Sequence, residues 1–312
     1  MSAGSESSRR SAQSIPPRLS PHSTAVLQAL LVTFAWATSW VIIKLGLEDI
    51  PALTFAGLRY TLAFACLLPL VLRPAHRREL RDLPGRSWAW LIALGLLYIA
   101  VAQGAQFAGL SRLPAVSVNL LLNFTSVVVA LLGVALLSER PALAQWGGIA
   151  LNVVGVLVYF YPAALPADQV TGLLIVAIGV LANALSSVLG RSLNRSRELH
   201  PLIVTTVSIG VGGITLLAAG VITQGLPRLD PIHWLYVGWL AVVNTAFAFT
   251  VWNHTLRTLP AVESSIINGT MLIQIPVLGV IFLHETLSPQ QLVGMALAGL
   301  GALVVQLRRG RQ

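Results

Sequence analysis

The heptapeptide LSRLPAV at residues 110–116 returns as LRTLPAV at residues 256–262, which is 146 positions further along the chain. When this match is extended without a gap to residues 110–155 and 256–301, 15 of the 46 aligned positions are identical. Apolar segments match easily by chance, because Leu, Val, Ala and Gly dominate both. The sequence nevertheless predicts an internal repeat, because rarer residues also match at this offset: Trp88 with Trp234, Pro114 with Pro260, Glu139 with Glu285, Gly148 with Gly294 and Gly155 with Gly301.

The composition is that of a membrane protein. Of the 312 residues, 55% are hydrophobic and 10% are charged, whereas about a quarter of the residues of a soluble domain are charged. The apolar residues come in runs of about 20, the length that crosses about 30 Å of hydrocarbon at 1.5 Å per residue. The runs predict an all-α integral membrane protein with ten transmembrane helices, at residues 24–46, 51–72, 87–110, 114–137, 142–161, 170–193, 201–223, 232–256, 260–284 and 288–307.

Each copy of the repeat holds five of these helices, at residues 24–161 and 170–307. Because five is odd, a first copy that starts on one face of the membrane leaves the second copy to start on the other face. The two five-helix repeats are therefore predicted to be inverted, about a pseudo-two-fold axis in the membrane plane. Residues 1–23 are predicted to be a disordered cytoplasmic tail and residues 308–312 a second cytoplasmic tail. The apolar run behind the first tail is too long for a cleaved signal peptide.

The basic residues are concentrated in alternate connections. With the N-terminus in the cytoplasm, 16 of the 20 Lys and Arg residues lie in cytoplasmic loops or tails, and the exceptions are Lys44, Arg59, Arg112 and Arg228. Such a bias orients membrane proteins. Both termini are therefore predicted to be cytoplasmic, in a multi-pass protein of the inner membrane. The net charge of +9 is then an orientation signal with some attraction to the lipid bilayer, and no nucleic-acid partner is expected.

Four tracts carry a resemblance to a known family: WATSWVIIK at 36–44, LRY at 58–60, LPAV…SERPALAQWGG in the first copy and LPAV…HETLSPQQLVG in the second. They resemble the drug/metabolite transporter superfamily in its ten-helix form, which has two five-helix EamA-type repeats. The resemblance implies a carrier, and it is most similar to bacterial exporters of amino acids, including aromatic ones. Because many solutes are carried by proteins with these motifs, the motifs imply no particular substrate. With one residue inserted, Asn183 stands where Trp36 aligns in the second half, so no site is transferred by symmetry alone.

No carboxylate lies near the middle of a predicted span, because all 11 Asp and Glu residues fall in loops or within a turn of a helix end. Proton-driven carriers commonly use a buried Asp or Glu as a relay, so gradient-driven exchange is the simpler hypothesis. Glu263 is explained by the positive end of its own helix, or it is reached from a cavity. Glu139 and Glu285 end equivalent helices. We interpret both as structural, with the start of the next helix or a neighbouring Arg as the partner.

Polar side chains at mid-membrane depth are the candidates for a substrate site, because they must face protein or an aqueous cavity. An amide both donates and accepts hydrogen bonds, so it can hold a zwitterion or a neutral polar solute. Hydrogen bonds that merely join helices are the alternative for each amide. Their occurrence at one depth on several helices favours a shared cavity. The candidates are Asn119, Asn123, Asn183, Asn244, Asn268 and Gln274, with Trp36, Tyr98 and Trp252 as apolar walls or as packing aromatics.

Lys44 and Arg59 are the only basic residues in the first two predicted spans. An unpaired cation in hydrocarbon is costly, so each is a candidate partner for the carboxylate of a solute. For Lys44 the alternative is an ion pair with Glu48 or Asp49, which follow closely in the sequence.

The sequence favours a transporter over an enzyme. His254 and His284 have no metal-ligand spacing with the other histidines, and the single cysteine, Cys66, cannot form a thiolate zinc site. No cofactor or metal is expected. The predicted function is export of an amino acid or a similar small metabolite by alternating access, with the solute held between the halves by spans one, three, four, six, eight and nine. The alternatives are another amphipathic solute, such as a nucleoside or a cationic drug, and a membrane enzyme or sensor. The oligomeric state stays open.

Overall fold

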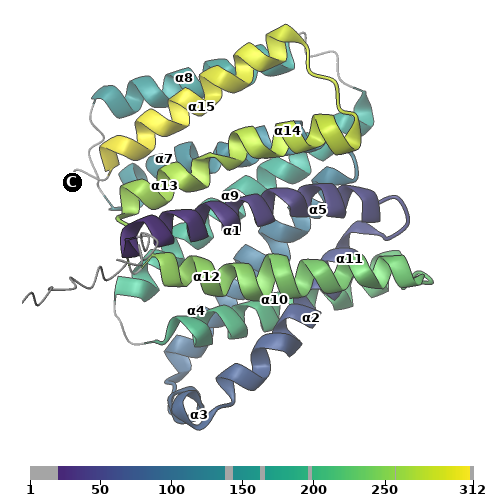
Figure 1. Ribbon diagram of the computed structural model, residues 1–312, viewed down its shortest axis with the longest axis vertical. Helices are drawn as coiled ribbons and strands as arrows, with labels where there is room; N and C mark the ends of the chain where they lie inside the picture. Colours follow the sequence, from purple (N-terminus) through teal and green to yellow (C-terminus); the bar gives the residue numbers. More distant parts are fainter. Residues whose placement is uncertain (1–19, 138–142, 162–165, 196–198, 257, 310–312) are drawn as a thin grey trace, which may run out of the picture.

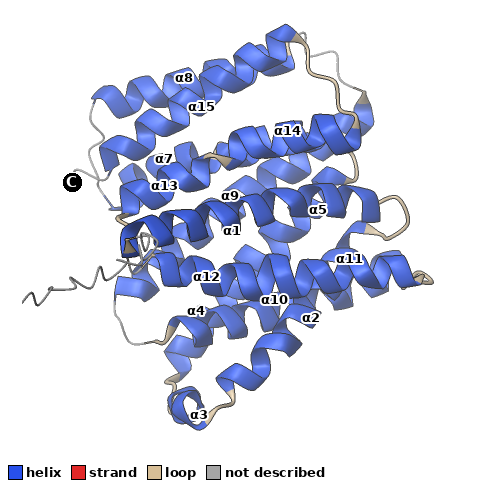
Figure 2. Ribbon diagram, in the orientation of Figure 1, coloured by secondary structure: helices blue, strands red, loops and turns tan. Residues whose placement is uncertain are grey.

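A computed structural model describes residues 20–137, 143–161, 166–195, 199–256 and 258–309. All regular structure in these ranges is helical, as Figure 2 shows. Nine helices in them are long and apolar enough to cross a membrane, and Pro289–Val305 is a shorter apolar helix. Together they form the ten predicted spans, so the prediction of an all-α membrane protein is confirmed. Most of both predicted tails, at residues 1–19 and 310–312, and the residue Glu139 lie outside the described part of the chain.

The helices follow one another in two sets of five spans, which Figure 1 colours in chain order. The first set is α1 (Pro21–Gly46), α2 (Ala52–Val71), the continuous run of α4 (Gly85–Leu94), η1 (Gly95–Gln103) and α5 (Gly104–Leu110), the broken pair α6 (Ala115–Asn123) and α7 (Thr125–Leu137), and α8 (Leu143–Phe160). The second set is α9 (Ala167–Arg195), α10 (Pro201–Gln224), the run of α11 (Pro231–Ala241), η2 (Val242–Phe247) and α12 (Ala248–Thr255), the broken pair α13 (Ala261–Gly269) and α14 (Met271–Leu283), and α15 (Pro289–Arg309).

The predicted connection between the second and third spans contains a short helix, α3 (Pro74–Arg81), in which no residue is buried. Three of its eight residues are arginines, so it remains at the surface. Figure 1 places the start of α1 and the end of α15 at the same end of the bundle. An even number of spans requires this arrangement.

The two halves break at equivalent positions. Phe124 separates α6 from α7, and Thr270, 146 residues later, separates α13 from α14. Pro114 and Pro260 directly precede the first helix of each pair, as the repeat predicts. In both halves the span before this proline contains a π-helical segment, η1 or η2. π-helical segments are rare overall, and those that occur are often found at functional sites. The repeat recognised in the sequence therefore recurs in the irregular backbone.

The equivalent helices α8 and α15 pack against each other in opposite directions. Their backbones approach each other closely at two reciprocal pairs of glycines, Gly148 with Gly301 and Gly155 with Gly294. Asn152 donates from Nδ2 to the carbonyl oxygen of Ala298, its own equivalent in the repeat, at 2.7 Å. A reciprocal pattern of this kind is the signature of a two-fold axis, which here passes beside Asn152. The two halves are thus inverted relative to each other.

The glycines of this pair allow the two backbones to touch. A Cβ on Gly155 would lie 2.6 Å from the carbonyl oxygen of Gly294, whereas a Cβ on Gly147 would have nothing within 4 Å. Because overpacking a tight contact costs about 1 to 3 kcal/mol, we expect Gly155→Ala to lower the apparent Tm of the purified protein in detergent by several degrees. The matched control, Gly147→Ala, only improves helix propensity and is expected to keep or slightly raise Tm. Equal Tm values for the two variants would contradict the tight crossing.

The two halves interleave around the centre of the bundle. α1 packs on α12 and α14 of the second half, whereas its equivalent α9 packs on η1, α5 and α7 of the first half. The pair α2 and α10 closes another side, with Gly57 against Leu217 and Gly220 against Thr54. Because the first helix of each half packs against the other half, side chains of both halves meet inside the bundle.

Candidate functional site

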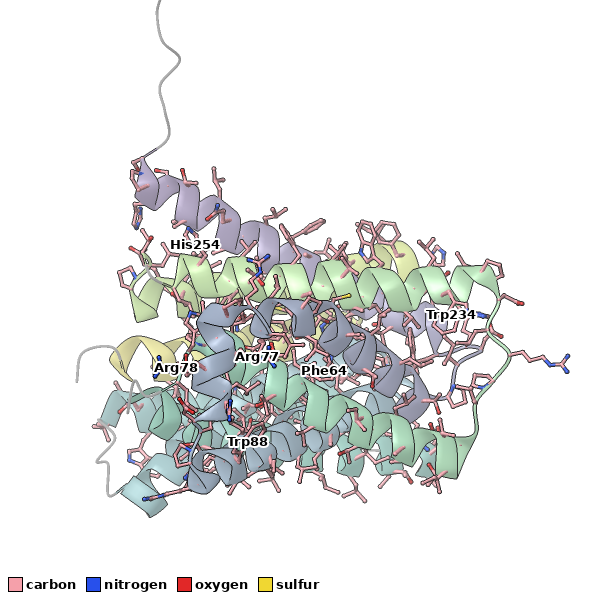
Figure 3. The ribbon with its side chains drawn as sticks, turned by 90° about the horizontal axis from the view of Figure 1, so that it is seen from below. Phe64, Arg77, Arg78, Trp88, Trp234 and His254 are labelled. Carbon is pink, nitrogen blue, oxygen red and sulfur yellow. The ribbon has the colours of Figure 1, made fainter. Side chains whose placement is uncertain are left out.

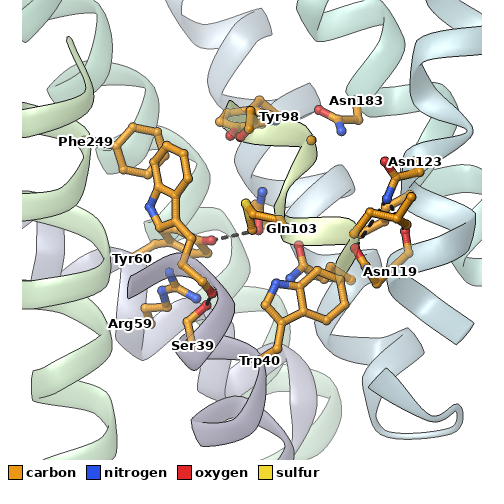
Figure 4. A pocket seen from close by; sticks show the side chains of 17 residues that line it. Ser39, Trp40, Arg59, Tyr60, Tyr98, Gln103, Asn119, Asn123, Asn183 and Phe249 are labelled. Atoms are coloured by element: carbon orange, nitrogen blue, oxygen red, sulfur yellow. Dashed lines mark hydrogen bonds between the residues drawn. The ribbon is translucent and has the colours of Figure 1, made fainter. Parts of the chain in front are cut away.

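A cavity of about 270 Å³ lies where the two halves meet. Every span that was predicted to contribute does so, and the second span adds Arg59 and Tyr60. The cavity borders the irregular backbone of η1 and of both helix breaks, which a membrane tolerates where the backbone lines a cavity. The lining residues, shown in Figure 4, are Trp36, Ser39, Trp40, Arg59, Tyr60, Tyr98, Gln103, Gln106, Asn119, Leu122, Asn123, Asn183, Phe249, Asn268, Gly269, Met271 and Leu272.

Arg59 brings a buried positive charge to the wall of this cavity. Only 5% of the residue is exposed. Its Nε donates to Thr245 Oγ1 at 3.1 Å, and its guanidinium carbon lies 5.0 Å from the centre of the Tyr60 ring. Among the described residues, no carboxylate lies within 4.0 Å of Arg59, and none of those that line the cavity is acidic. The guanidinium therefore has donors available for an anionic group, and its fork geometry suits a carboxylate.

Amides form the side of the cavity opposite Arg59 in Figure 4. Asn123 donates from Nδ2 to the carbonyl oxygen of Asn119 at 3.0 Å. The Nδ2 of Asn119 is itself buried and has no partner among the described atoms. Asn183, from α9, lies on the same side. A buried amide without a partner costs free energy, so this side is suited to the polar groups of a solute.

Trp36 and Phe249 form an aromatic side of the cavity. Their ring centres lie 5.3 Å apart, and Trp252 stacks behind Trp36, also with ring centres 5.3 Å apart. Trp36 donates from Nε1 to the carbonyl oxygen of Asn244, in η2, at 3.1 Å. The polar edge of the indole is satisfied by this hydrogen bond, so the ring is left as an apolar surface.

The predicted site residues divide into two groups. Asn244 is fully buried and donates from Nδ2 to the carbonyl oxygen of Ala35 in α1. Gln274 donates to the hydroxyl of Thr270 at 3.0 Å, across the helix break. Gln274 also donates to the hydroxyl of Thr33, in α1, at 3.4 Å. Both amides thus join α1 to helices of the second half, which is the alternative interpretation of such residues. The cavity lining includes Trp36, Arg59, Tyr98, Asn119, Asn123, Asn183 and Asn268, but not Lys44, Asn244, Trp252 or Gln274.

Lys44 binds the corner between α5 and α6. Its Nζ donates to the carbonyl oxygens of Leu110 and Leu113, at 2.6 and 2.8 Å. Leu110 ends α5, and Leu113 lies in the turn that follows; the negative end of a helix favours a cation. Asp49, which the sequence offered as a partner for Lys44, lies 3.1 Å from His233 instead. The ammonium group is thus bonded to two backbone oxygens, and no carboxylate of the described residues lies within 4.0 Å of it.

Glu285, from the other half of the molecule, contacts the same turn between α5 and α6. Its Oε1 and Oε2 accept from the backbone N–H groups of Ala115 and Val116, at 2.6 and 3.1 Å. The expected partner was the next helix or an arginine, so the partner is corrected to the start of α6. The chain turns back here because His284 ends α14 with a left-handed φ of 54°. Gly279 leaves room for the carboxylate, since a Cβ there would lie 3.2 Å from Oε2.

Several lining residues were not singled out in the sequence: Ser39, Trp40, Tyr60, Gln103, Gln106 and Phe249. The hydroxyl of Tyr60 donates to Gln103 Oε1 at 2.8 Å, which ties the second span to η1. A signal was present in Gln103 and Gln106, which are amides within a predicted span. They lie near its end, and the preference for mid-span residues excluded them. Nothing in the sequence distinguished Phe249 from the other aromatic residues.

The chain is similar to known transporters over most of its length. The model of the EamA-like transporter family matches residues 23–161 and 170–307. A "Probable amino-acid metabolite efflux pump" of Salmonella typhimurium is 29% identical over 297 residues, which cover 88% of this chain and 92% of that protein. An "Uncharacterized inner membrane transporter" of Escherichia coli is 28% identical over 247 residues, or 74% of each chain. A solved crystal structure shares the fold, with a TM-score of 0.65 and 18% identity, over 93% of this chain and 100% of that one.

One family model thus matches the chain twice, once in each half. The two matches agree with the inverted helix pairs and with the cavity between the halves. The chain belongs to the EamA-like transporter family and is a multi-pass membrane transporter.

Proposed function

We propose that this transporter exports amino acids, or similarly small metabolites that carry a carboxylate, from the cytoplasm by alternating access. The observation that carries the proposal is Arg59, a buried cation on the cavity wall that has no carboxylate partner among the described residues. An idle charge at this depth is costly. A solute carboxylate would supply the missing partner.

The other walls fit the rest of an amino acid. Asn119, Asn123 and Asn183 offer amide groups to an ammonium or a carboxylate, and Trp36 and Phe249 offer an apolar surface to a hydrophobic side chain. A volume of about 270 Å³ lies just below the range of roughly 300 to 1,000 Å³ for drug-sized ligands. Size therefore favours a small metabolite.

A cationic drug fits the cavity poorly, because Arg59 would repel it and no described lining residue is acidic. The same lack of a lining carboxylate supports exchange down a solute gradient, since a buried Asp or Glu is the usual proton relay. The related efflux pump, named for amino-acid metabolites, supports export as the direction. In the proposed topology both termini lie in the cytoplasm and the membrane is the inner membrane.

Counterflow into proteoliposomes tests this function. Vesicles loaded with unlabelled leucine, phenylalanine or tryptophan are diluted into the labelled amino acid, and protein-free vesicles serve as the control. We expect protein-dependent uptake of at least one of them, and an imposed pH gradient should change the final accumulation little. Counterflow of a nucleoside or a cationic dye without any amino acid would replace the proposed substrate class. A large accumulation driven by the pH gradient would overturn the exchange mechanism.

A further inference from the structure

A second cavity, of about 590 Å³, opens at the end of the bundle where α2 ends and α10 begins. Its mouth carries Arg73, His76, His200 and His254, and its deeper part is lined by aliphatic residues such as Leu67 and Val204. Figure 3, which views the bundle from the α3 side, places His254 and Trp234 toward opposite ends. The mouth thus lies at the end where α1 begins, which is the cytoplasmic end in the proposed topology.

Phe249 lines both this cavity and the central one. Its ring packs against Trp36, on the aromatic side of the central cavity, with ring centres 5.3 Å apart. The wall of the second cavity runs along the eighth span from Ala246 to Leu256, a rise of about 15 Å at 1.5 Å per residue. Phe249 stands near the deep end of that wall. Phe249 therefore lies in the wall that the second cavity shares with the Arg59 cavity.

The mouth is chemically suited to an anion. Arg73 has no carboxylate within 4.0 Å among the described residues. The imidazoles of His76 and His200 are in contact, with ring centres 4.4 Å apart and ring planes tilted by 43°. The carboxylate on the adjoining helix, Glu79, accepts from the backbone N–H of His200 at 2.7 Å. The mouth therefore offers a guanidinium and imidazole donors above an apolar interior.

We propose that this second cavity is the loading vestibule of the transporter. It takes amphipathic solutes with a carboxylate, whose anionic end binds at Arg73, His76 and His254 while the apolar end points toward Phe249. Movement of the Phe249 side chain then passes the solute to Arg59. The proposal rests on the proposed export of such solutes, and it adds a second binding site and its charge preference.

Reaction rates at a single engineered cysteine test the charge preference without any substrate. Thr205 lines the vestibule, and the only natural cysteine, Cys66, is removed by Cys66→Ser. The Thr205→Cys protein is treated with anionic sulfonatoethyl methanethiosulfonate and with the cationic trimethylammonioethyl reagent. We expect Arg73→Gln to lower the anionic-to-cationic rate ratio by roughly two- to fivefold, as loss of one nearby charge predicts.

Arg78→Gln is the matched control, because Arg78 lies on the neighbouring helix α3 with its side chain 91% exposed and outside the vestibule lining. It should leave the rate ratio at Thr205→Cys unchanged. The anion site would be wrong if the rate ratio were the same in the parent Thr205→Cys protein and in its Arg73→Gln and Arg78→Gln variants. Anionic phosphatidylglycerol in the vesicles provides the second comparison. If this lipid blocks the anionic reagent and Arg73→Gln relieves the block, the site holds a lipid phosphate and the loading role is wrong.

Measurements of transport kinetics distinguish a failure of the vestibule proposal from a failure of the proposed function. In vesicles that carry the vestibule on the outside, we expect Arg73→Gln and His254→Gln to raise the KM of the transported amino acid several-fold and to leave kcat nearly unchanged. Arg78→Gln should change neither constant. If the unmodified protein transports amino acids and KM is unaffected in all three variants, the vestibule proposal fails while the function stands. If no amino acid is transported but the rate ratio shifts as expected, the function fails while the anion site stands.

Discussion

Replacement of Arg59 by Gln is expected to reduce amino-acid transport more than any other single change in the cavity. Arg59 is 5% exposed and donates from Nε to Thr245 Oγ1 at 3.1 Å. The variant keeps a polar side chain, which is shorter, and loses the charge. A hydrogen bond to a charged group contributes about 1.5 to 3 kcal/mol. The loss corresponds to a fall of roughly 10- to 150-fold in apparent affinity.

Counterflow at several solute concentrations measures this effect. Arg59→Lys should recover part of the transport, because it keeps the charge but not the fork geometry. Arg228→Gln, at an exposed position, controls for the loss of a positive charge as such. Size-exclusion profiles should show that all three variants are folded. Normal transport by a folded Arg59→Gln protein would remove the central support for a carboxylate substrate.

Replacement of Glu285 by Leu is expected to give the largest loss of stability. The carboxylate accepts two backbone N–H groups at the start of α6, at 2.6 and 3.1 Å. A buried amide without a partner costs about 1 to 3 kcal/mol, and a change of 1 kcal/mol moves Tm by about 2 to 4 °C in a soluble protein of 150 to 250 residues. We therefore expect the apparent Tm in detergent to fall by roughly 5 to 10 °C.

Lys44→Met should act on the same corner, since Lys44 holds the carbonyl oxygens of Leu110 and Leu113. Because the two side chains hold adjoining ends of two helices, the double variant should lose less than the sum of the single losses. The control is Glu263→Gln, whose side chain is 42% exposed and contacts His22 at 2.8 Å. An exposed pair of this kind is worth at most about 1 kcal/mol. Two outcomes would contradict a joint role of Lys44 and Glu285 in stabilising the turn between α5 and α6. One is additive losses of stability, and the other is a Glu285→Leu protein as stable as Glu263→Gln.

The fold was largely accessible from the sequence because its main determinants are local. Length and apolarity define the spans, so α1 ends at Gly46 and α10 begins at Pro201, as predicted. The matched heptapeptides set the register of the halves, and the breaks at Phe124 and Thr270 follow that register. The π-helical segments were not predicted, since each spans only a turn or two and is too short to show a periodicity of its own. α3 was missed because it has only eight residues, three of them arginines, and so gives no apolar run of the length that marks a span.

The site was less accessible, because depth in the membrane does not say which way a side chain points. Asn123 and Asn244 lie at similar depth in the sequence pattern, yet the first lines the cavity and the second donates to the backbone of α1. Only the packing of α1 against the second half separates the two cases. Lys44 contacts the carbonyl oxygens of Leu110 and Leu113, at the end of another span, and spacing along α1 does not reveal such a contact.

The exchange of α1 and α9 between the halves has a consequence for how such a protein arises. A polypeptide with only five helices would have no surface on which to pack its own first helix, because that surface belongs to the other copy. Two such polypeptides would have to insert in opposite orientations and then find each other in equal amounts. Fusion into one chain fixes the ratio of the two orientations and makes their assembly intramolecular, with the high effective concentration that a covalent link provides.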